Sequence, residues 1–265
     1  MKRVISYSLF WAGKDEHALL YCNGLRAICR AHHTLFPDWE WRIYHDSTIS
    51  KCPVASVLLK YAEAGLVNLV RMGGQKEICR AMIQRMKPAW ESGVEITLCR
   101  DLDSLPTPRE AMAVRQFVES EAGMHCITDH PQHGIPIMGG LCGFRSQILR
   151  NLTQLGSYEA LIAGEPLARQ GDDQRLLMKK VWPMMRNSMC EHRFSGFEPS
   201  PHAIKSYTSP SPLDLPWVPC GVLEGGDALL PFMGAPGFDT QTAVDFYNKN
   251  APSEVVERIS KSELA

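Results

Sequence analysis

Arg100-Asp101-Leu102-Asp103-Ser104 is the stretch of sequence that decides the fold, and it directly follows the apolar run Val94–Cys99. Such a run is typical of a buried β-strand, and in an extended backbone alternate side chains share a face. Asp101 and Asp103 are therefore expected to point the same way at the end of a central strand. Two carboxylates form a hard oxygen site suited to Mg²⁺ or Mn²⁺, which would hold a nucleotide diphosphate. The alternative is a solvated acidic turn.

The residues after the aspartate pair predict a helix that runs to about Ser120. Thr107 is a good N-cap, Pro108 suits the first helical position, and Glu110 completes a capping box. The pair therefore lies in a turn between a strand and a helix. Because two aspartates at this spacing occur often by chance, it is this context that favours a metal site.

Strand and helix patterns alternate along most of the chain, which predicts an α/β fold with a mainly parallel central sheet flanked by helices. The expected strands are Val4–Phe10, Trp39–Tyr44, Val67–Arg71, Val94–Cys99 and Met124–Thr128. The other expected helices are His17–Leu35, Val54–Ala64, Lys76–Met86, Arg145–Leu155, Asp172–Val181 and Thr240–Asn248. Proline and glycine are frequent after Trp182, which predicts loops and short strands there. Without repeats or a low-complexity linker, residues 1–265 are expected to form a single domain.

The composition is ordinary for a soluble globular protein, with 45% hydrophobic and 22% charged residues. The net charge of −1 gives no overall attraction to nucleic acid or membrane, although a local basic patch would still serve a polyanion. The nine cysteines are scattered, with no Cys-x-x-Cys pair. They indicate neither a zinc cage nor a disulfide framework, and they favour a reduced, cytoplasmic protein. No apolar segment reaches the length of a membrane span, and oligomeric state leaves no trace.

Polar residues are expected to meet at one rim of the sheet, because ligands of open parallel sheets bind beyond the carboxyl ends of the strands. The four segments concerned are Ser6-Tyr7-Ser8, His45-Asp46, Arg100–Ser104 and Thr128-Asp129-His130. Ser6, Tyr7, Ser8, Asp46, Arg100 and Asp101 are therefore candidate nucleotide contacts. For Tyr7 the alternative is a place in the core.

Two further segments carry candidate sugar contacts. Gly139 and Gly140 would let the backbone approach a ligand closely, or would only shape a turn. Asp129 could accept hydrogen bonds from sugar hydroxyls or act as a base. Asp173 follows Asp172 at a helix start, where one of the two carboxylates caps the helix and the other is free to face a sugar.

Five cations lie within residues 71–87: Arg71, Lys76, Arg80, Arg85 and Lys87. Such a patch could contact a diphosphate, with Arg80 as the candidate, or a polyanionic acceptor, although a solvated helix face is the commoner explanation. In the C-terminal part, His192 is the candidate third metal ligand, and His202 is its alternative. An ordinary surface histidine would explain either one.

Together these motifs resemble the GT-A glycosyltransferases, and more narrowly a group of small bacterial and viral glycosyltransferase-like proteins. The resemblance spans about residues 4–182 and fades beyond Trp182. It rests on Ser6-Tyr7-Ser8-Leu9, Phe36-Pro37-Asp38-Trp39, Arg100–Ser104 with Arg109-Glu110, Asp129-His130-Pro131, Gly139-Gly140-Leu141-Cys142-Gly143 and Asp173-Gln174.

The resemblance implies a nucleotide-binding half over about residues 1–105 and a sugar- and acceptor-binding half, with the C-terminal loops, over 106–265. By position, Asp103 would be the principal metal ligand and Asp101 a ribose or metal contact. If the reaction inverts the anomeric centre, Asp129 or Asp173 would be the base, whereas in a retaining reaction both would only position the substrates.

The activity implied is metal-dependent transfer of a sugar from a nucleotide diphosphate sugar, by analogy a UDP-sugar, to an acceptor hydroxyl. The acceptor would be a glycan or a hydroxymethylated pyrimidine in DNA, in the cytoplasm of a bacterium or of a virus-infected host. Two other functions stay open from the residues. One is a non-catalytic nucleotide-sugar-binding module, and the other is a nucleotidyltransferase.

Overall fold

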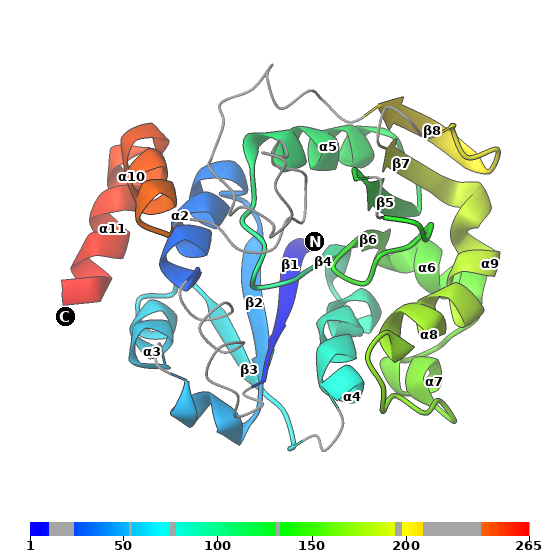
Figure 1. Cartoon of the computed structure of the whole chain (residues 1–265), viewed down its shortest axis with the longest axis horizontal. Coiled ribbons are helices and arrows are strands. Elements are labelled where there is room, and N and C mark those ends of the chain that lie inside the picture. Colours follow the sequence, from blue (N-terminus) through cyan, green and yellow to red (C-terminus); the bar gives the residue numbers. More distant parts are fainter. Residues whose placement is uncertain are drawn as a thin grey trace, which may run out of the picture.

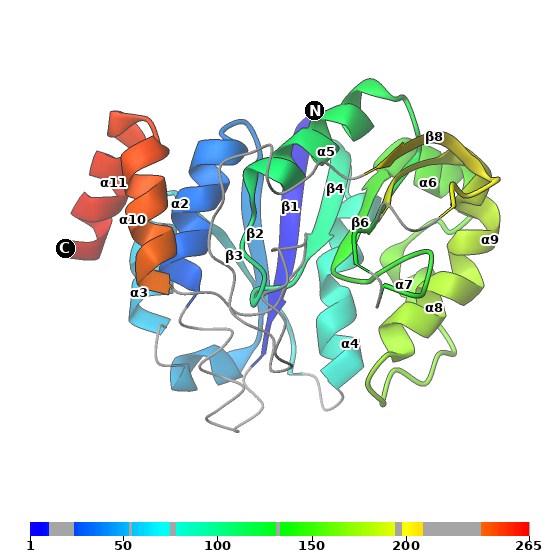
Figure 2. The same ribbon diagram turned by 45° about the horizontal axis from the view of Figure 1, so that its top comes forward.

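The computed structural model describes residues 1–10, 24–52, 55–74, 78–130, 133–193, 198–208 and 240–264. The strands of this part form one sheet in the order β3-β2-β1-β4-β6-β5-β7-β8, with helices on both sides (Figures 1 and 2). The strands are β1 (Lys2–Leu9), β2 (Glu40–His45), β3 (Asn68–Arg71), β4 (Val94–Arg100), β5 (Met124–Thr128), β6 (Leu141–Arg145), β7 (Met189–Arg193) and β8 (Ala203–Thr208). The predicted α/β class is confirmed.

Only β6 opposes the general strand direction within the described sheet. It is antiparallel to both neighbours, β4 and β5, whereas the other strand pairs are parallel. Its central residue is Gly143, where a Cβ would stand 2.5 Å from Leu98 Cδ2. Gly143 therefore allows β6 to pack closely against β4. The sequence alone was also compatible with a turn at this glycine-rich segment.

The helices largely follow the predicted ranges. They are α2 (Leu25–Leu35), α3 (Ala55–Glu63), α4 (Ile78–Met82), α5 (Pro108–Glu119), α6 (Ser146–Thr153), α7 (Tyr158–Ile162), α8 (Asp172–Lys180), α9 (Trp182–Met185), α10 (Thr240–Asn250) and α11 (Ser253–Leu264). Three 3₁₀ helices accompany them, η1 (Ser47–Lys51), η2 (Ile83–Trp90) and η3 (Arg186–Ser188). The start of the helix predicted from His17 lies outside the described residues.

The helix predicted over Lys76–Met86 differs from the observed structure after Met82. There the chain tightens into η2, which contains Pro88 instead of ending before it. The carbonyl of Pro88 accepts a hydrogen bond from the N–H of Glu91 at 3.0 Å, so the proline closes the last turn as an acceptor. The change of helix type alters which side chains of this segment face the sheet.

Two hydrophobic layers cover the two faces of the sheet. In β4, Ile96 and Leu98 belong to the layer that contains residues of α2, α3, α5, α10 and α11. Cys99 belongs to the other layer, with residues of η2, α6, α7 and α8. Because alternate side chains of a strand point to opposite faces, β4 is buried on both sides and its end is held rigidly.

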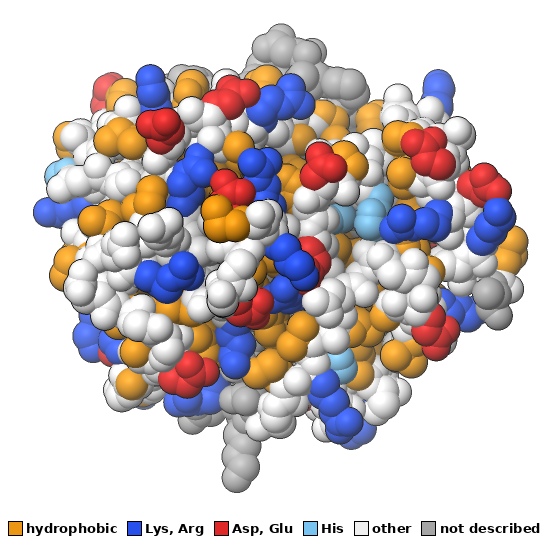
Figure 3. All heavy atoms as spheres, turned by 180° about the vertical axis from the view of Figure 1, so that it is seen from behind, with side chains coloured by type: hydrophobic (Ala, Val, Ile, Leu, Met, Phe, Trp, Pro, Cys, Tyr) orange, Lys and Arg blue, Asp and Glu red, His pale blue; other side chains and the backbone are white. Residues whose placement is uncertain are grey.

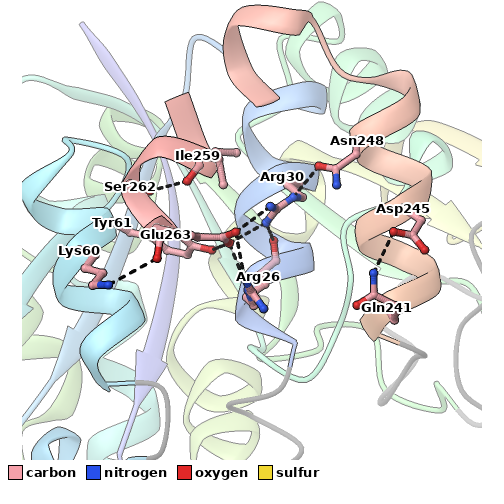
Figure 4. A network of polar contacts seen from close by, with 10 residues as sticks. All are labelled: Arg26, Arg30, Lys60, Tyr61, Gln241, Asp245, Asn248, Ile259, Ser262 and Glu263. Atoms are coloured by element: carbon pink, nitrogen blue, oxygen red, sulfur yellow. Dashed lines mark hydrogen bonds and ion pairs between the residues drawn. The ribbon is translucent and has the colours of Figure 1, made fainter. Parts of the chain in front are cut away.

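The C-terminal helices pack on the outer side of α2 and α3, and a polar network fixes them there (Figure 4). The carboxylate of Glu263 in α11 accepts hydrogen bonds from Arg30 at 2.9 and 3.0 Å, from Arg26 at 3.1 and 3.2 Å, and from the Tyr61 hydroxyl. Arg30 also donates to Asn248 in α10 at 2.7 Å. One buried arginine therefore links both C-terminal helices to α2. The sequence did not predict α11.

The described cysteines are of two kinds. Cys29, Cys79, Cys99, Cys126, Cys142 and Cys190 are buried free thiols, as the sequence predicted. Cys52, in contrast, is disulfide-bonded, which the scattered cysteines did not predict. Among the described helices, none combines the length and the apolar character that a membrane crossing requires.

Candidate functional site

The turn after β4 directs its two aspartates away from the core. Leu102 between them is 1% exposed, whereas Asp101 and Asp103 are partly exposed. The N–H of Ser104 donates to the carbonyl of Asp101 at 3.2 Å and closes the turn. The alternation of a buried leucine with two partly exposed carboxylates is what the strand pattern predicted.

Arg85 joins the aspartate turn to helix α8. Its guanidinium donates to the carboxylate of Asp101 and, through Nη2, to Oδ2 of Asp173 at 3.3 Å. Burial alone would lower the pKa of Arg85, but the two carboxylates more than offset this effect, so the pKa is raised. The cation therefore stays charged in the interior and holds together two acids that lie far apart in the sequence.

Gly139 and Gly140 lie directly against this group. A Cβ on Gly140 would stand 1.8 Å from Oδ2 of Asp101, and a Cβ on Gly139 would stand 2.8 Å from Nη2 of Arg85. The latter Cβ would also lie 3.0 Å from Oδ2 of Asp173. A Cβ at either position would therefore displace these charged side chains, which glycine leaves in place. We call Arg85, Asp101, Asp173, Gly139 and Gly140 the acidic cluster.

Asp103 differs from the other two aspartates in its electrostatic surroundings. Oδ1 accepts a hydrogen bond from Ser104 at 3.3 Å, and no ion pair to Asp103 occurs within the described part of the chain. Burial, and then the negative charge of Asp101, raises the pKa of Asp103 to about 6. A divalent cation between the two carboxylates would oppose both effects. Arg85 pairs with Asp101 and partly offsets this effect, so a bound cation would add to the positive charge that Arg85 supplies.

The residues of β1 are placed inside the sheet and not on its rim. Ser6 and Tyr7 are 0% exposed, and Tyr7 packs edge-on against Trp41. The Ser8 hydroxyl donates to the carbonyl of Met82 at 3.0 Å and accepts from the N–H of Arg85 at 3.2 Å. The structure therefore gives Ser8 a positioning role, because it holds the start of η2 and with it Arg85. Because Ser6 and Tyr7 are buried, their positions do not support direct contact with a nucleotide.

Arg100 and Asp46 also have partners within the chain. Arg100 donates to Glu110 at 2.5 Å, and the side chains of this ion pair are 3% and 4% exposed. Glu110 therefore pairs with Arg100, while the predicted cap is half formed through Thr107, which accepts from the N–H of Glu110 at 3.3 Å. Asp46 caps η1 by accepting from the N–H of Thr48 at 2.8 Å. Arg100 and Asp46 therefore stabilise the segments at this edge of the sheet through contacts inside the protein.

Asp129, a candidate base, is held by a buried arginine. Nη2 of Arg109 lies 3.1 Å from Oδ1 and 2.9 Å from Oδ2 of Asp129, and both side chains are less than a tenth exposed. Both oxygens of Asp129 accept from the same guanidinium, which fixes the direction of the carboxylate. The sequence analysis named Arg109 only among the residues that carry the family resemblance. Nothing in the sequence spacing predicted its ion pair with Asp129.

His192 lies in a hydrogen-bonded core network and not beside the aspartate pair. Its Nδ1 is 2.9 Å from Nε2 of His125, and its Nε2 is 2.7 Å from Oε1 of Gln116. Burial lowers the pKa of His192 to about 3, so the ring is neutral. Both ring nitrogens are engaged, and the described residues contain no cluster of three side chains arranged to hold a metal. The structure therefore places His192 in the core on β7, three strands from β4, and not beside the aspartates it was expected to join.

The predicted basic patch is divided between separate surroundings. Arg85 is buried in the acidic cluster, while Lys87 lies 4.8 Å from the centre of the Tyr158 ring and 3.8 Å from Glu159. Arg80 is half-buried on α4. Arg71 lies at the exposed end of the edge strand β3, and Lys76 falls outside the described residues. The change from α4 to η2 breaks the helical spacing, so the cations of this segment that the structure describes do not form one face.

Ile135 lies between two cavities in the described part of the chain. One of about 480 Å³ is lined by residues of α8, among them Gln174, and by Ile135. The other, of about 310 Å³, lies against β5 and β7, and Ile135 also lines it. Ile135 therefore forms a wall common to both cavities. Gln174, which lines the larger cavity, directly follows Asp173 in the sequence.

Comparison with known proteins gives similarities of fold. No protein-family model matches the chain, and neither does any curated protein. Among solved structures, residues 1–349 of TarS from S. aureus are 12% identical with a TM-score of 0.47, and the match covers 72% of this chain and 58% of that one. The chain thus spans little more than half of that structure.

Two other structures match at similar levels. The mannosyltransferase PcManGT from Pyrobaculum calidifontis, solved with GDP-Man and Mn²⁺, is 14% identical with a TM-score of 0.46, and the match covers 98% of this chain and 73% of that one. A putative nucleotide-diphospho-sugar transferase from Desulfovibrio desulfuricans G20 is 13% identical with a TM-score of 0.46, covering 73% and 81%. All three similarities concern the fold alone, at low identity and with TM-scores of 0.46 to 0.47.

Proposed function

We propose that this protein is a metal-dependent glycosyltransferase that moves a sugar from a nucleotide diphosphate sugar, with UDP as the preferred nucleotide, to an acceptor hydroxyl. The observation that carries the proposal is the arrangement of three aspartates at the end of β4. Asp101 and Asp173 share one arginine, while Asp103 stands beside them without an ion pair in the described chain. Such a rim of the sheet is where ligands of α/β proteins bind.

The donor atoms fit Mg²⁺ or Mn²⁺. These ions are commonly held by one or two carboxylates, with substrate phosphates and water completing the coordination. Asp103 would be the principal ligand and Asp101 the second, and the raised pKa of Asp103 indicates a site that favours added positive charge. When bound, the ion would neutralise the charge that develops on the departing diphosphate.

The remaining members of the acidic cluster would orient the sugar. Asp173 lies at the start of α8, and the backbone of Gly139 passes close to its carboxylate. Arg85 fixes the direction of that carboxylate, so a hydroxyl of the donor sugar would meet an acceptor that is already oriented. In an inverting reaction Asp129 or Asp173 would take the acceptor proton. In a retaining reaction Asp173 and Asp129 would both act by positioning.

Replacement of Asp103 by alanine tests the proposal. We expect D103A to lose Mn²⁺-dependent hydrolysis of nucleotide sugars by at least about a hundredfold, while its melting temperature stays near that of the wild type. D38A, which removes an exposed carboxylate elsewhere, is the matched control. A panel of nucleotide sugars with mass analysis of the products provides the assay.

The identity of the product separates the alternatives. Release of a nucleoside diphosphate supports glycosyl transfer, whereas release of pyrophosphate would identify a nucleotidyltransferase. Full turnover of D103A, or of the wild type with the metal chelated, would refute the proposed role of the aspartate pair.

A further inference from the structure

The cavity against β5 and β7 combines an apolar base with a polar upper part. Parallel pairing places Cys126 beside Glu191 and Thr128 beside Arg193, so all four side chains face the cavity from neighbouring strands. The polar residues Thr128 and Arg193 stand at the carboxyl ends of the strands. Trp182, at the start of α9, contributes the aromatic part of the wall. We call this space the β5–β7 cavity.

The polar groups of the cavity are fixed before any ligand binds. Oε1 of Glu191 accepts from the N–H of Ser200 at 2.7 Å and from the Ser206 hydroxyl at 2.5 Å. Nε of Arg193 donates to the same Ser206 hydroxyl at 3.3 Å. One serine therefore orients both charged side chains, which lowers the entropy that a ligand must lose with them.

The chemistry of the lining suits a polyhydroxylated ring. Carboxylates accept hydrogen bonds from vicinal hydroxyls, a guanidinium donates to them, and an indole ring covers the apolar face of a sugar. The volume of about 310 Å³ lies at the lower end of the ~300–1,000 Å³ range of small-molecule sites, which suits one saccharide unit. Glu198, which is exposed, also lines the cavity and adds a second carboxylate.

The charge of the lining opposes a phosphodiester. Glu191 and Glu198 contribute two negative charges against the single guanidinium of Arg193. His133 adds no cation near neutral pH, because burial, and then His130, lowers its pKa to about 4. Duplex DNA carries one negative charge per ~1.7 Å, so it needs the opposite sign of surface.

The exposed surfaces agree with this. The cations expected between residues 71 and 87 do not form one face, since Arg85 is buried and Lys87 covers Tyr158. On the face shown in Figure 3, basic and acidic side chains are interspersed and no basic stripe crosses it. The lining of the β5–β7 cavity and the face shown in Figure 3 therefore favour an acceptor that is not a polyanion.

We infer that the β5–β7 cavity binds a saccharide unit of the acceptor, and that the acceptor is a carbohydrate chain. The inference rests on the proposed function for the identity of the reaction, but saccharide binding itself does not require turnover. Through Ile135, the cavity adjoins the space beside Gln174, so a bound chain would extend toward Asp173 and the acidic cluster.

Saccharide binding is tested with the full chain on an array of neutral and acidic oligosaccharides, followed by calorimetry with the best-bound member. We expect W182L to weaken that affinity about tenfold, and W182F, which keeps an aromatic face, to restore most of it. E198Q should weaken binding about threefold to tenfold. Glu198 is exposed, so this variant tests the cavity without disturbing the fold. E254Q, an exposed carboxylate on α11, is the matched control.

A short duplex carrying hydroxymethylcytosine serves as the competing probe. The inference is overturned if no oligosaccharide binds, if W182L and E198Q bind saccharide as the wild type does, or if the duplex binds more tightly than every saccharide. Donor hydrolysis without acceptor is measured on the same variants and should be unchanged. Loss of the proposed function would appear as absent Mn²⁺-dependent hydrolysis in the wild type, whereas failure of this inference would leave that hydrolysis intact.

Discussion

Replacement of Glu263 by glutamine should detach the C-terminal helices from α2 and lower the stability of the whole domain. The carboxylate is 10% exposed and accepts hydrogen bonds from Arg26, Arg30 and Tyr61 (Figure 4). Arg30 is 4% exposed, so E263Q leaves a buried guanidinium without its countercharge. Removing one partner of a buried ion pair costs about 3–5 kcal/mol.

The expected loss lies at the lower end of that range. Arg30 keeps two hydrogen bonds, at 2.7 Å to Asn248 and at 3.1 Å to the carbonyl of Arg26, and the amide of the variant still offers one oxygen. We therefore expect a loss of about 3 kcal/mol in the free energy of unfolding. In a domain of this size, that loss of unfolding free energy corresponds to a fall of roughly 6–10 °C in melting temperature.

The pH dependence provides a second measurement with a defined sign. Burial alone would raise the pKa of Glu263, but the hydrogen bonds from Arg30, Arg26 and Tyr61 outweigh it and lower the pKa from 4.5 to about 2. A carboxyl whose folded pKa is lowered stabilises the protein above its unfolded pKa and loses that effect as the pH falls through the folded value. The difference between wild type and E263Q should therefore be constant above pH 4.5 and shrink toward pH 2.

Unfolding by denaturant and by heat, followed by circular dichroism, measures both effects. E254Q on the same helix changes an exposed carboxylate and controls for the loss of one negative charge. If E263Q unfolds within experimental error of E254Q at neutral pH, the network does not hold the helices. A difference that persists unchanged at pH 2 would show that the charge of Glu263 is not its cause.

Two further predictions concern the support of the acidic cluster. G140A places a Cβ 1.8 Å from Oδ2 of Asp101, so we expect the carboxylate to turn away and Mn²⁺-dependent donor hydrolysis to fall at least about tenfold. G156A, where a Cβ would meet nothing within 4 Å, is its control, and equal activity of the two variants would contradict the close approach. E110Q leaves Arg100 buried without its countercharge and should cost about 3–5 kcal/mol in denaturant unfolding. E119Q, an exposed change on the same helix, should cost nothing measurable, and a similar stability for E110Q would rule out this role of the pair.

Local sequence patterns predicted the elements that carry the aspartate pair. The apolar run before Arg100 is strand β4, and the helix expected after Thr107 begins at Pro108 with the Thr107 cap in place. These features depend on neighbours within a few residues, so propensity and capping chemistry are sufficient to find them. The side chain of Glu110 is an exception, because it pairs with Arg100 at the end of β4 instead of completing the cap.

Local sequence patterns could not predict contacts between side chains that lie far apart in the sequence. Arg85 was counted in a basic patch, for a diphosphate or as part of a solvated helix face, but in the structure it lies in η2 and pairs with Asp101 and Asp173. His192 was expected near a metal, but the pairing of β7 with β5 places it against His125. In both cases the position of the side chain follows from the packing of whole elements.

The sequence by itself determined that this chain forms an α/β sheet with a carboxylate pair at the end of its central strand, because strand periodicity and helix capping act over a few residues. Only the tertiary structure decided which charges meet there. Ion pairs in a buried environment form between the groups that packing brings within about 3 Å, whatever their separation along the chain. That is why Arg85 joined the site and why Asp129 came to be held by Arg109.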